Sequence, residues 1–76
     1  MIDYTKYYEN YEKKPRDIHV QRYIQQFIIF CQMRHIPIKE FDEAEKKYKL
    51  QRRLSHIEDS IEEEKELHEF VQFCMN

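Results

Sequence analysis

The sequence predicts an all-α protein, a compact bundle of three to four helices that forms a single domain over residues 1–76. The chain contains no glycine, which disfavours β-rich folds because their tight hairpin turns depend on the positive φ that glycine adopts easily. Charged residues make up 37% of the chain, and many of them are glutamate and lysine, which favour helices. Apolar residues recur at the spacing of one helical face. These observations together predict the fold class.

The first helix is expected at about residues 3–13 and carries a stripe of tyrosines. The tyrosines at positions 4, 7, 8 and 11 follow the i, i+3, i+4, i+7 spacing of one helical face. Two interpretations are open. The stripe covers a core, or Tyr4, Tyr8 and Tyr11 face a partner protein, because tyrosine is common at interfaces where its hydroxyl stays hydrated.

The second helix is expected at about residues 16–35 and is the most apolar part of the chain. Pro15 suits the start of a helix, where its missing N–H costs nothing, and Asp17 in the first turn suits the helix dipole. The apolar residues that surround this helix are Val20, Tyr23, Ile24, Phe27, Ile28, Ile29, Phe30, Cys31 and Met33. A helix that is apolar nearly all round is normally the centre of a bundle or of an oligomer. Because so short a chain buries little surface alone, we also expect a homodimer.

Two further helices are expected at about residues 38–56 and 60–75. Pro37 separates them from the second helix, because it disfavours helical backbone at Ile36. A coiled-coil-like seam begins in the third helix but fails after Ile61. The seam consists of Leu50, Leu54, Ile57 and Ile61, and an apolar stripe resumes in a different phase at Leu67, Phe70, Val71 and Cys74.

The boundary between these two helices carries two sequences typical of capping boxes. Ser55 is followed by Glu58, and Ser60 is followed by Glu63. We therefore expect a kink or a short interruption between residues 55 and 60. The alternative is one continuous helix through both segments.

The sequence predicts no catalytic residue, no metal site and no cofactor. The residues that could bind zinc are Cys31, His35, His68 and Cys74, but their spacing is not that of a zinc site. Cys31 lies in the most apolar segment, whereas an activated thiol needs an accessible, electropositive pocket. Two distant cysteines are typical of thiols in a reducing compartment.

No segment of the sequence is expected to enter a membrane. The longest uninterrupted apolar run is 27–31, far below the roughly 20 residues of a membrane-spanning helix. The first residues mix tyrosine with charged residues and contain no apolar segment of a signal peptide. A soluble, cytoplasmic protein is therefore expected.

Charge is distributed unevenly along the chain. Six basic and four acidic residues fall in each of the ranges 1–35 and 36–56, whereas 57–76 contains one basic and seven acidic residues. In a helix, the acidic positions 58, 62, 66 and 69 would lie along one side about 6 Å apart, a spacing similar to that of phosphates along a DNA strand. The predicted partner-binding carboxylates are Glu58, Asp59, Glu62, Glu63, Glu66 and Glu69. The alternative is an ordinary solvated acidic face.

A basic stretch in the third helix allows a different function, that of a small DNA-binding regulator. Its residues are Lys46, Lys47, Lys49, Arg52 and Arg53, and helical basic stretches can contact phosphates. The same segment also contains acidic residues at ion-pair spacing, and the net charge of the chain is −2. Binding to nucleic acid is therefore not the favoured prediction.

A resemblance adds to this interpretation. The segment Gln26-Phe27-Ile28-Ile29-Phe30 resembles the peptide with which proteins dock on bacterial sliding clamps. The short length and the acidic segment from Glu58 to Glu69 resemble those of small, acidic, helical proteins that phages make to disable a host machine. The resemblance implies an inhibitor that occupies a host replication or transcription protein, such as a sliding clamp, in the host cytoplasm. A structural oligomer held by the apolar seam and the tyrosine stripe is a further alternative.

Overall fold

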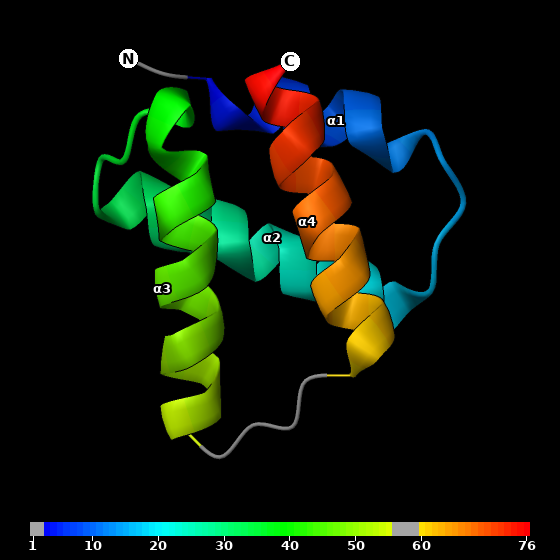
Figure 1. Cartoon of the computed structure of the whole chain (residues 1–76). Helices are drawn as coiled ribbons and strands as arrows, with labels where there is room; N and C mark the ends of the chain where they lie inside the picture. The colour runs from blue at the N-terminus through cyan, green and yellow to red at the C-terminus, as the bar shows by residue number, and fades with distance from the viewer. Residues whose placement is uncertain (1–2, 56–59) are drawn as a thin grey trace.

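The computed structural model describes residues 3–55 and 60–76. Within these ranges the chain is helical and contains no strand, which confirms the predicted all-α bundle (Figure 1). The helices are α1 (Tyr4–Glu12), α2 (Ile18–Met33), the short 3-10 helix η1 (Ile38–Glu40), α3 (Phe41–Leu54) and α4 (Ile61–Met75). None of the helices in the described part of the chain is long and apolar enough to cross a membrane.

Helix α2 lies at the centre of the bundle and contacts α1, α3 and α4. Helices α3 and α4 also contact each other and run in opposite directions in front of α2 (Figure 1). Phe27 of α2 is 0% exposed, and its ring contacts those of Phe41, Tyr48 and Phe70 at centroid distances of 5.5, 5.6 and 6.4 Å. The prediction that the second helix forms the core is therefore confirmed.

The starts of α1, α2 and α4 are capped by short polar side chains. Asp17 is the N-cap of α2 and accepts a hydrogen bond from the backbone N–H of His19 at 2.9 Å. Ser60 caps α4 in the same way and accepts from the N–H of Glu63 at 3.1 Å. Because aspartate prefers the N-cap, where it satisfies an unpaired N–H, α2 begins one residue after Asp17, and not at Arg16 as expected.

The interruption expected between residues 55 and 60 is confirmed, and the alternative of one continuous helix is wrong. Ser55 is the C-cap of α3, and its Oγ donates to the carbonyl oxygen of Gln51 at 3.0 Å. Ser55 therefore ends α3, whereas its expected capping box would place it at the start of a helix. Glu58, the other residue of that capping box, lies outside the described residues. Only the Ser60 signal marks a helix start.

The seam from Leu50 to Ile61 does not form one packing surface. Leu50, Leu54 and Ile61 are 56%, 72% and 88% exposed, and Ile57 lies outside the described residues. Because α3 and α4 are separate and antiparallel, the seam residues do not lie on one continuous helix. The apolar residues of α4 that pack in the core are those of its second stripe, Leu67, Phe70, Val71 and Cys74.

The C-terminal end of α2 is closed by His35 in a conformation that usually requires glycine. His35 has a φ of 53°, and the N–H groups of His35 and Ile36 bond to the carbonyls of Gln32 and Cys31 at 3.2 and 3.0 Å. This pair of bonds is the Schellman motif, in which glycine is the common residue because it lacks a Cβ. Since the chain has no glycine, His35 carries the strain.

Replacing His35 with glycine is expected to stabilise the protein by about 0.5–1 kcal/mol. Glycine removes the roughly 1–2 kcal/mol strain of a left-handed residue, and the greater freedom of the unfolded chain cancels part of this gain. Urea unfolding followed by circular dichroism measures the change. His35→Ala is the control, because alanine keeps the Cβ and should bring no gain. An equal gain in both variants would contradict this assignment of strain.

Candidate functional site

The tyrosine stripe packs mainly inside the protein. Tyr4 and Tyr11 are 5% and 8% exposed, and Tyr4 stacks on Phe41 at a centroid distance of 5.7 Å while its hydroxyl donates to the carbonyl oxygen of Ile36. Tyr8 is half-buried and donates to the carbonyl oxygen of Gln21 at 3.4 Å. Tyr4 and Tyr11 therefore belong to this chain's own core, which favours the first of the two sequence interpretations. A contact of the tyrosine stripe with a partner stays a prediction.

The acidic helix α4 is partly neutralised by basic residues of the same chain. Three of its carboxylates form ion pairs: Glu64 with Arg53 at 2.9 Å, Glu66 with Arg16 at 3.1 Å and Glu69 with Lys14 at 3.7 Å. Glu62 is exposed and Glu63 half-buried. The two other predicted site residues, Glu58 and Asp59, lie outside the described residues. The row of glutamates at positions 62, 66 and 69 is thus not a row of unpaired carboxylates.

A buried cluster of Arg16, Tyr11 and Glu66, called here the Arg16 cluster, ties α4 to the segment between α1 and α2. The side chain of Arg16 is 3% exposed and that of Glu66 is 21% exposed. The Arg16 guanidinium lies 3.5 Å from the centroid of the Tyr11 ring and donates to the Tyr11 carbonyl at 2.8 Å. The Tyr11 hydroxyl donates to Glu66 Oε2 at 3.0 Å. The cluster therefore joins α4 to α1 and to the segment that follows α1.

The surroundings of the Arg16 cluster shift the pKa of both of its acidic groups, the Tyr11 hydroxyl and the Glu66 carboxyl. Burial raises the pKa of Tyr11, and the hydrogen bond to the Glu66 carboxylate raises it further. Burial also acts to raise the pKa of Glu66, but the hydrogen bonds from Arg16 and Tyr11 and the charge of Arg16 outweigh burial, so this pKa lies below its ordinary value. Glu66 is thus held as a carboxylate by its neighbours.

The basic stretch of α3 is also engaged within the protein. Besides the Arg53–Glu64 pair, Arg52 Nη1 donates to Gln26 Oε1 at 2.7 Å, and Lys49 Nζ lies 3.9 Å from Glu45 Oε1. Glu45 is 3% exposed, and the same Oε1 is 3.1 Å from His68 Nδ1. Lys49, Arg52 and Arg53 therefore have polar partners in this chain, and Lys46 and Lys47 are exposed.

The two cysteines are buried and free. Burial raises the pKa of Cys31 to about 12 and that of Cys74 to about 12. A thiol with so high a pKa is a poor nucleophile and a poor metal ligand at neutral pH. In the described residues no three His, Cys, Asp or Glu side chains come together as a metal-binding group would require.

The segment that resembles a clamp-docking peptide lies in the middle of α2. Phe27, Ile28 and Phe30 are 0%, 5% and 7% exposed, so most of its apolar residues pack in the core. An extended peptide that docks on another protein must expose these side chains. In this fold, the segment is a core element.

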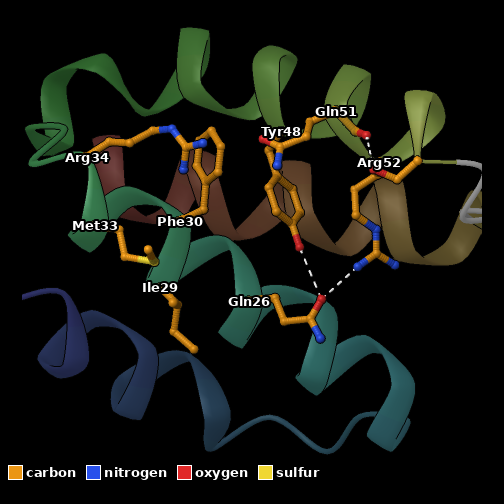
Figure 2. A pocket seen from close by; sticks show the side chains of 9 residues that line it. Gln26, Ile29, Phe30, Met33, Arg34, Tyr48, Gln51 and Arg52 are labelled. Carbon is orange, nitrogen blue, oxygen red and sulfur yellow. Dashed lines mark hydrogen bonds between the residues drawn. The ribbon is translucent and has the colours of Figure 1, made fainter.

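A hollow with a volume of about 370 Å³, called here the α2–α3 hollow, lies between α2 and α3. The rings of Phe30 and Tyr48 meet in it at a centroid distance of 5.2 Å, and Ile29 and Met33 remain 47% and 73% exposed. Figure 2 shows the rings of Phe30 and Tyr48 between the two helices, whereas Ile29 points away from α3. The residues that line the hollow are Gln26, Ile29, Phe30, Met33, Arg34, Tyr48, Gln51, Arg52 and Ser55.

The sequence interpretation missed this hollow, although one signal pointed to it. Ile29 and Met33 are four residues apart on α2 and lie off the stripe of Val20, Ile24, Phe27 and Cys31. Whether such a second apolar stripe is buried or exposed depends on where the neighbouring helices pack. Here a second, smaller hollow of about 120 Å³ between α1 and α2 also borders Ile29, so Ile29 forms a ridge between two depressions.

Protein-family models, curated proteins and solved structures gave no match to this chain.

Proposed function

We propose that this chain is a cytoplasmic, non-enzymatic protein-binding module that acts by covering a surface of another protein. The observation that carries the proposal is the exposure of Ile29 and Met33, 47% and 73%, beside a hollow whose walls include Phe30 and Tyr48. Apolar side chains that stay exposed around a hollow with a polar rim are typical of binding sites.

The chemistry of the hollow favours binding over catalysis. The lining residues that the structure describes include no histidine, carboxylate or thiol, and these are the groups that most often transfer protons or attack a substrate. The Tyr48 hydroxyl lies 3.4 Å from Gln26 Oε1, which orients it within the wall. The hollow can therefore hold a side chain, but it offers little to react with one.

The sharper prediction, an inhibitor that occupies a host DNA-handling protein through an acidic DNA-mimicking helix, remains a second candidate. The first turn of α4 contains Glu62, Glu63 and Glu64, and this concentration of carboxylates favours it. The pairing of Glu64, Glu66 and Glu69 within the chain weakens it, because each paired cation cancels part of the negative field. The DNA-mimic form of the proposal therefore depends on the carboxylates in the first turn of α4.

The expected homodimer belongs to the same proposal. Because α2 is contacted by α1, α3 and α4 of its own chain, most of its apolar surface is already covered. The large apolar residues of α2 that stay exposed are Ile18, Ile29 and Met33, and of these Ile29 and Met33 border the α2–α3 hollow. Self-association therefore stays a prediction that concerns the same surface as partner binding.

A comparison of two exposed substitutions distinguishes the two candidate surfaces. Met33→Glu places a charge in the α2–α3 hollow, and Glu62→Lys reverses a charge on α4. The tagged wild-type chain and both variants are incubated with a bacterial lysate, and the proteins retained are identified by mass spectrometry. We expect a protein that is retained by the wild type and by Glu62→Lys but lost with Met33→Glu, because burying a charge in an apolar site is costly.

Each other outcome has a definite meaning. Loss with Glu62→Lys but not with Met33→Glu would favour the DNA-mimic form over the hollow. Retention of no protein above the level of a blank resin would contradict the proposed function. Both positions are exposed, and unchanged circular dichroism of the variants is the control for folding. Ile18→Glu, at a position on α2 that is 56% exposed and outside the hollow, is the matched control for a new charge.

A further inference from the structure

The charges around the α2–α3 hollow indicate what kind of partner it takes. The nine described residues that line it include two arginines and no acidic residue. Arg34 comes from the C-terminal end of α2 and Arg52 from α3, and they lie at opposite ends of the row of side chains in Figure 2. An apolar floor between two cations is complementary to an apolar group flanked by carboxylates.

Both arginines are held in place by the walls of the hollow. The Arg34 guanidinium lies 4.0 Å from the centroid of the Phe30 ring, and that of Arg52 lies 4.7 Å from the centroid of Tyr23 while bonding to Gln26. A guanidinium stacked on a ring keeps the N–H groups at its edge directed outward, where they match the two oxygens of a carboxylate. Because these side chains are already ordered, a ligand loses less entropy on binding them.

Arg34 is the cation most available to a partner. It is exposed, and among the residues that the structure describes it has no carboxylate partner. The volume of about 370 Å³ lies near the lower end of ligand pockets, which span roughly 300–1,000 Å³. The hollow therefore accepts side chains that project from a partner element rather than a whole element.

We propose that the α2–α3 hollow binds an acidic amphipathic helix of another protein, with apolar side chains of that helix between Phe30, Tyr48 and Met33 and a carboxylate on Arg34. A groove between two helices is a common site for such a helix, which inserts residues from successive turns. Exposed methionine adapts to the shape of the inserted side chains. The inference rests on the proposed function and specifies the partner class.

A second copy of this chain fits the hollow less well. The acidic helix of a second copy, α4, buries its central apolar stripe, since Leu67, Phe70 and Val71 are 0% exposed. Its exposed apolar residues, Ile61, Phe73 and Met75, lie only near its two ends. In addition, α4 lies behind α2 when the hollow faces the viewer (Figure 2). Two hollows that faced each other would bring like charges together, which is unfavourable.

Selection from a library of random peptides tests the proposal. Displayed peptides of about 15 residues, long enough for an isolated helix to begin to form, are selected on the immobilised full chain and counter-selected on the Met33→Glu variant. We expect the retained peptides to be net negative, with apolar residues at the i, i+3, i+4, i+7 spacing. Their affinities are then measured by fluorescence anisotropy.

Substitutions at two arginines of the same protein provide the quantitative test. Arg34→Glu should weaken binding of the best peptide about tenfold at low salt, and the effect should shrink as salt rises, because the interaction is between exposed charges. Arg22→Glu is the matched control, since Arg22 is exposed on α2 but does not line the hollow. Met33→Glu should reduce binding at least tenfold.

The outcomes separate this inference from the proposed function. Retained peptides that are basic or neutral, or equal losses with Arg34→Glu and Arg22→Glu, would overturn the acidic partner. The function as a binding module would still stand if a lysate protein is lost with Met33→Glu. Light scattering that shows a dimer, with Met33→Glu converting it to a monomer, would assign the hollow to a second copy and overturn the inference.

Discussion

Phe27→Ala is expected to lower the free energy of unfolding by about 3–5 kcal/mol, the usual cost of removing a buried aromatic side chain. A domain of this length has a total stability of about 4–11 kcal/mol, so the variant should be partly or wholly unfolded. Phe27 is 0% exposed and contacts rings of α2, α3 and α4, so the cavity would lie where three helices meet. Urea unfolding followed by far-ultraviolet circular dichroism measures the loss.

Two companion variants make the Phe27 experiment decisive. Ile29→Ala, two positions along the same helix, removes a side chain that is 47% exposed and should cost less than about 1 kcal/mol. Phe27→Leu keeps most of the apolar volume and should cost about 1–1.5 kcal/mol, which remains measurable if the alanine variant does not fold. If Phe27→Ala proved as stable as Ile29→Ala, Phe27 would not be at the centre of the core.

Glu66→Ala is expected to lower the free energy of unfolding by about 3 kcal/mol. Removal of one partner of a buried ion pair typically costs about 3–5 kcal/mol, because the other charge is left buried and uncompensated. Arg16 is 3% exposed and would keep its charge in the absence of the carboxylate. The lower end of the range applies because the Glu66 side chain is 21% exposed and water can enter when it is removed.

The ion pair between Glu69 and Lys14 is the matched control on the same helix. Its side chains are 40% and 63% exposed and 3.7 Å apart, so Glu69→Ala should change the stability by no more than about 0.5 kcal/mol. Glu66→Gln, which keeps a hydrogen-bond acceptor without the charge, should fall between the two alanine variants. Similar losses at positions 66 and 69 would contradict the distinction between a buried and an exposed pair.

The Glu66–Arg16 pair also makes the stability depend on pH. Because the pKa of Glu66 lies below its ordinary value of 4.5 in the folded chain, folding favours its ionised form. This contribution is complete above the pKa of the unfolded chain and is lost as the pH falls through the lower pKa of the folded chain. The difference in stability between the wild type and Glu66→Gln should therefore shrink as the solution is acidified below about pH 4.5.

Much of the fold could be predicted because its signals are local. Pro15 and Pro37 bound α2, and the zero glycine count disfavours turns of β-rich folds. The break between residues 55 and 60 is predicted by the two capping boxes beside a change of apolar phase, and both signals lie within a few positions of the chain. The sequence could not show which of Ser55 and Ser60 begins a helix, because both precede a glutamate by three residues. Only the path of the chain around each serine distinguishes the end of a helix from its start.

The candidate sites were harder to predict, because their properties depend on residues that are distant in the sequence. Arg16 and Glu66 are 50 positions apart, and no local pattern indicates that one neutralises the other. Glu64 and Arg53 likewise belong to the acidic and the basic segment of the sequence, although their side chains form an ion pair at 2.9 Å. The net charge of each segment therefore overestimates the number of unpaired charges that the acidic or the basic segment presents at the surface.

The sequence by itself determined the helical class, the central place of α2 and the break between α3 and α4, because helix periodicity, proline and capping residues act within a few positions of the chain. Only the tertiary structure decided which groups remain available at the surface. Packing places Tyr4 and Tyr11 in the core, pairs three carboxylates of α4 with cations, and leaves Ile29 and Met33 beside an open hollow. Burial and ion pairing depend on which helices meet, and that depends on the whole chain.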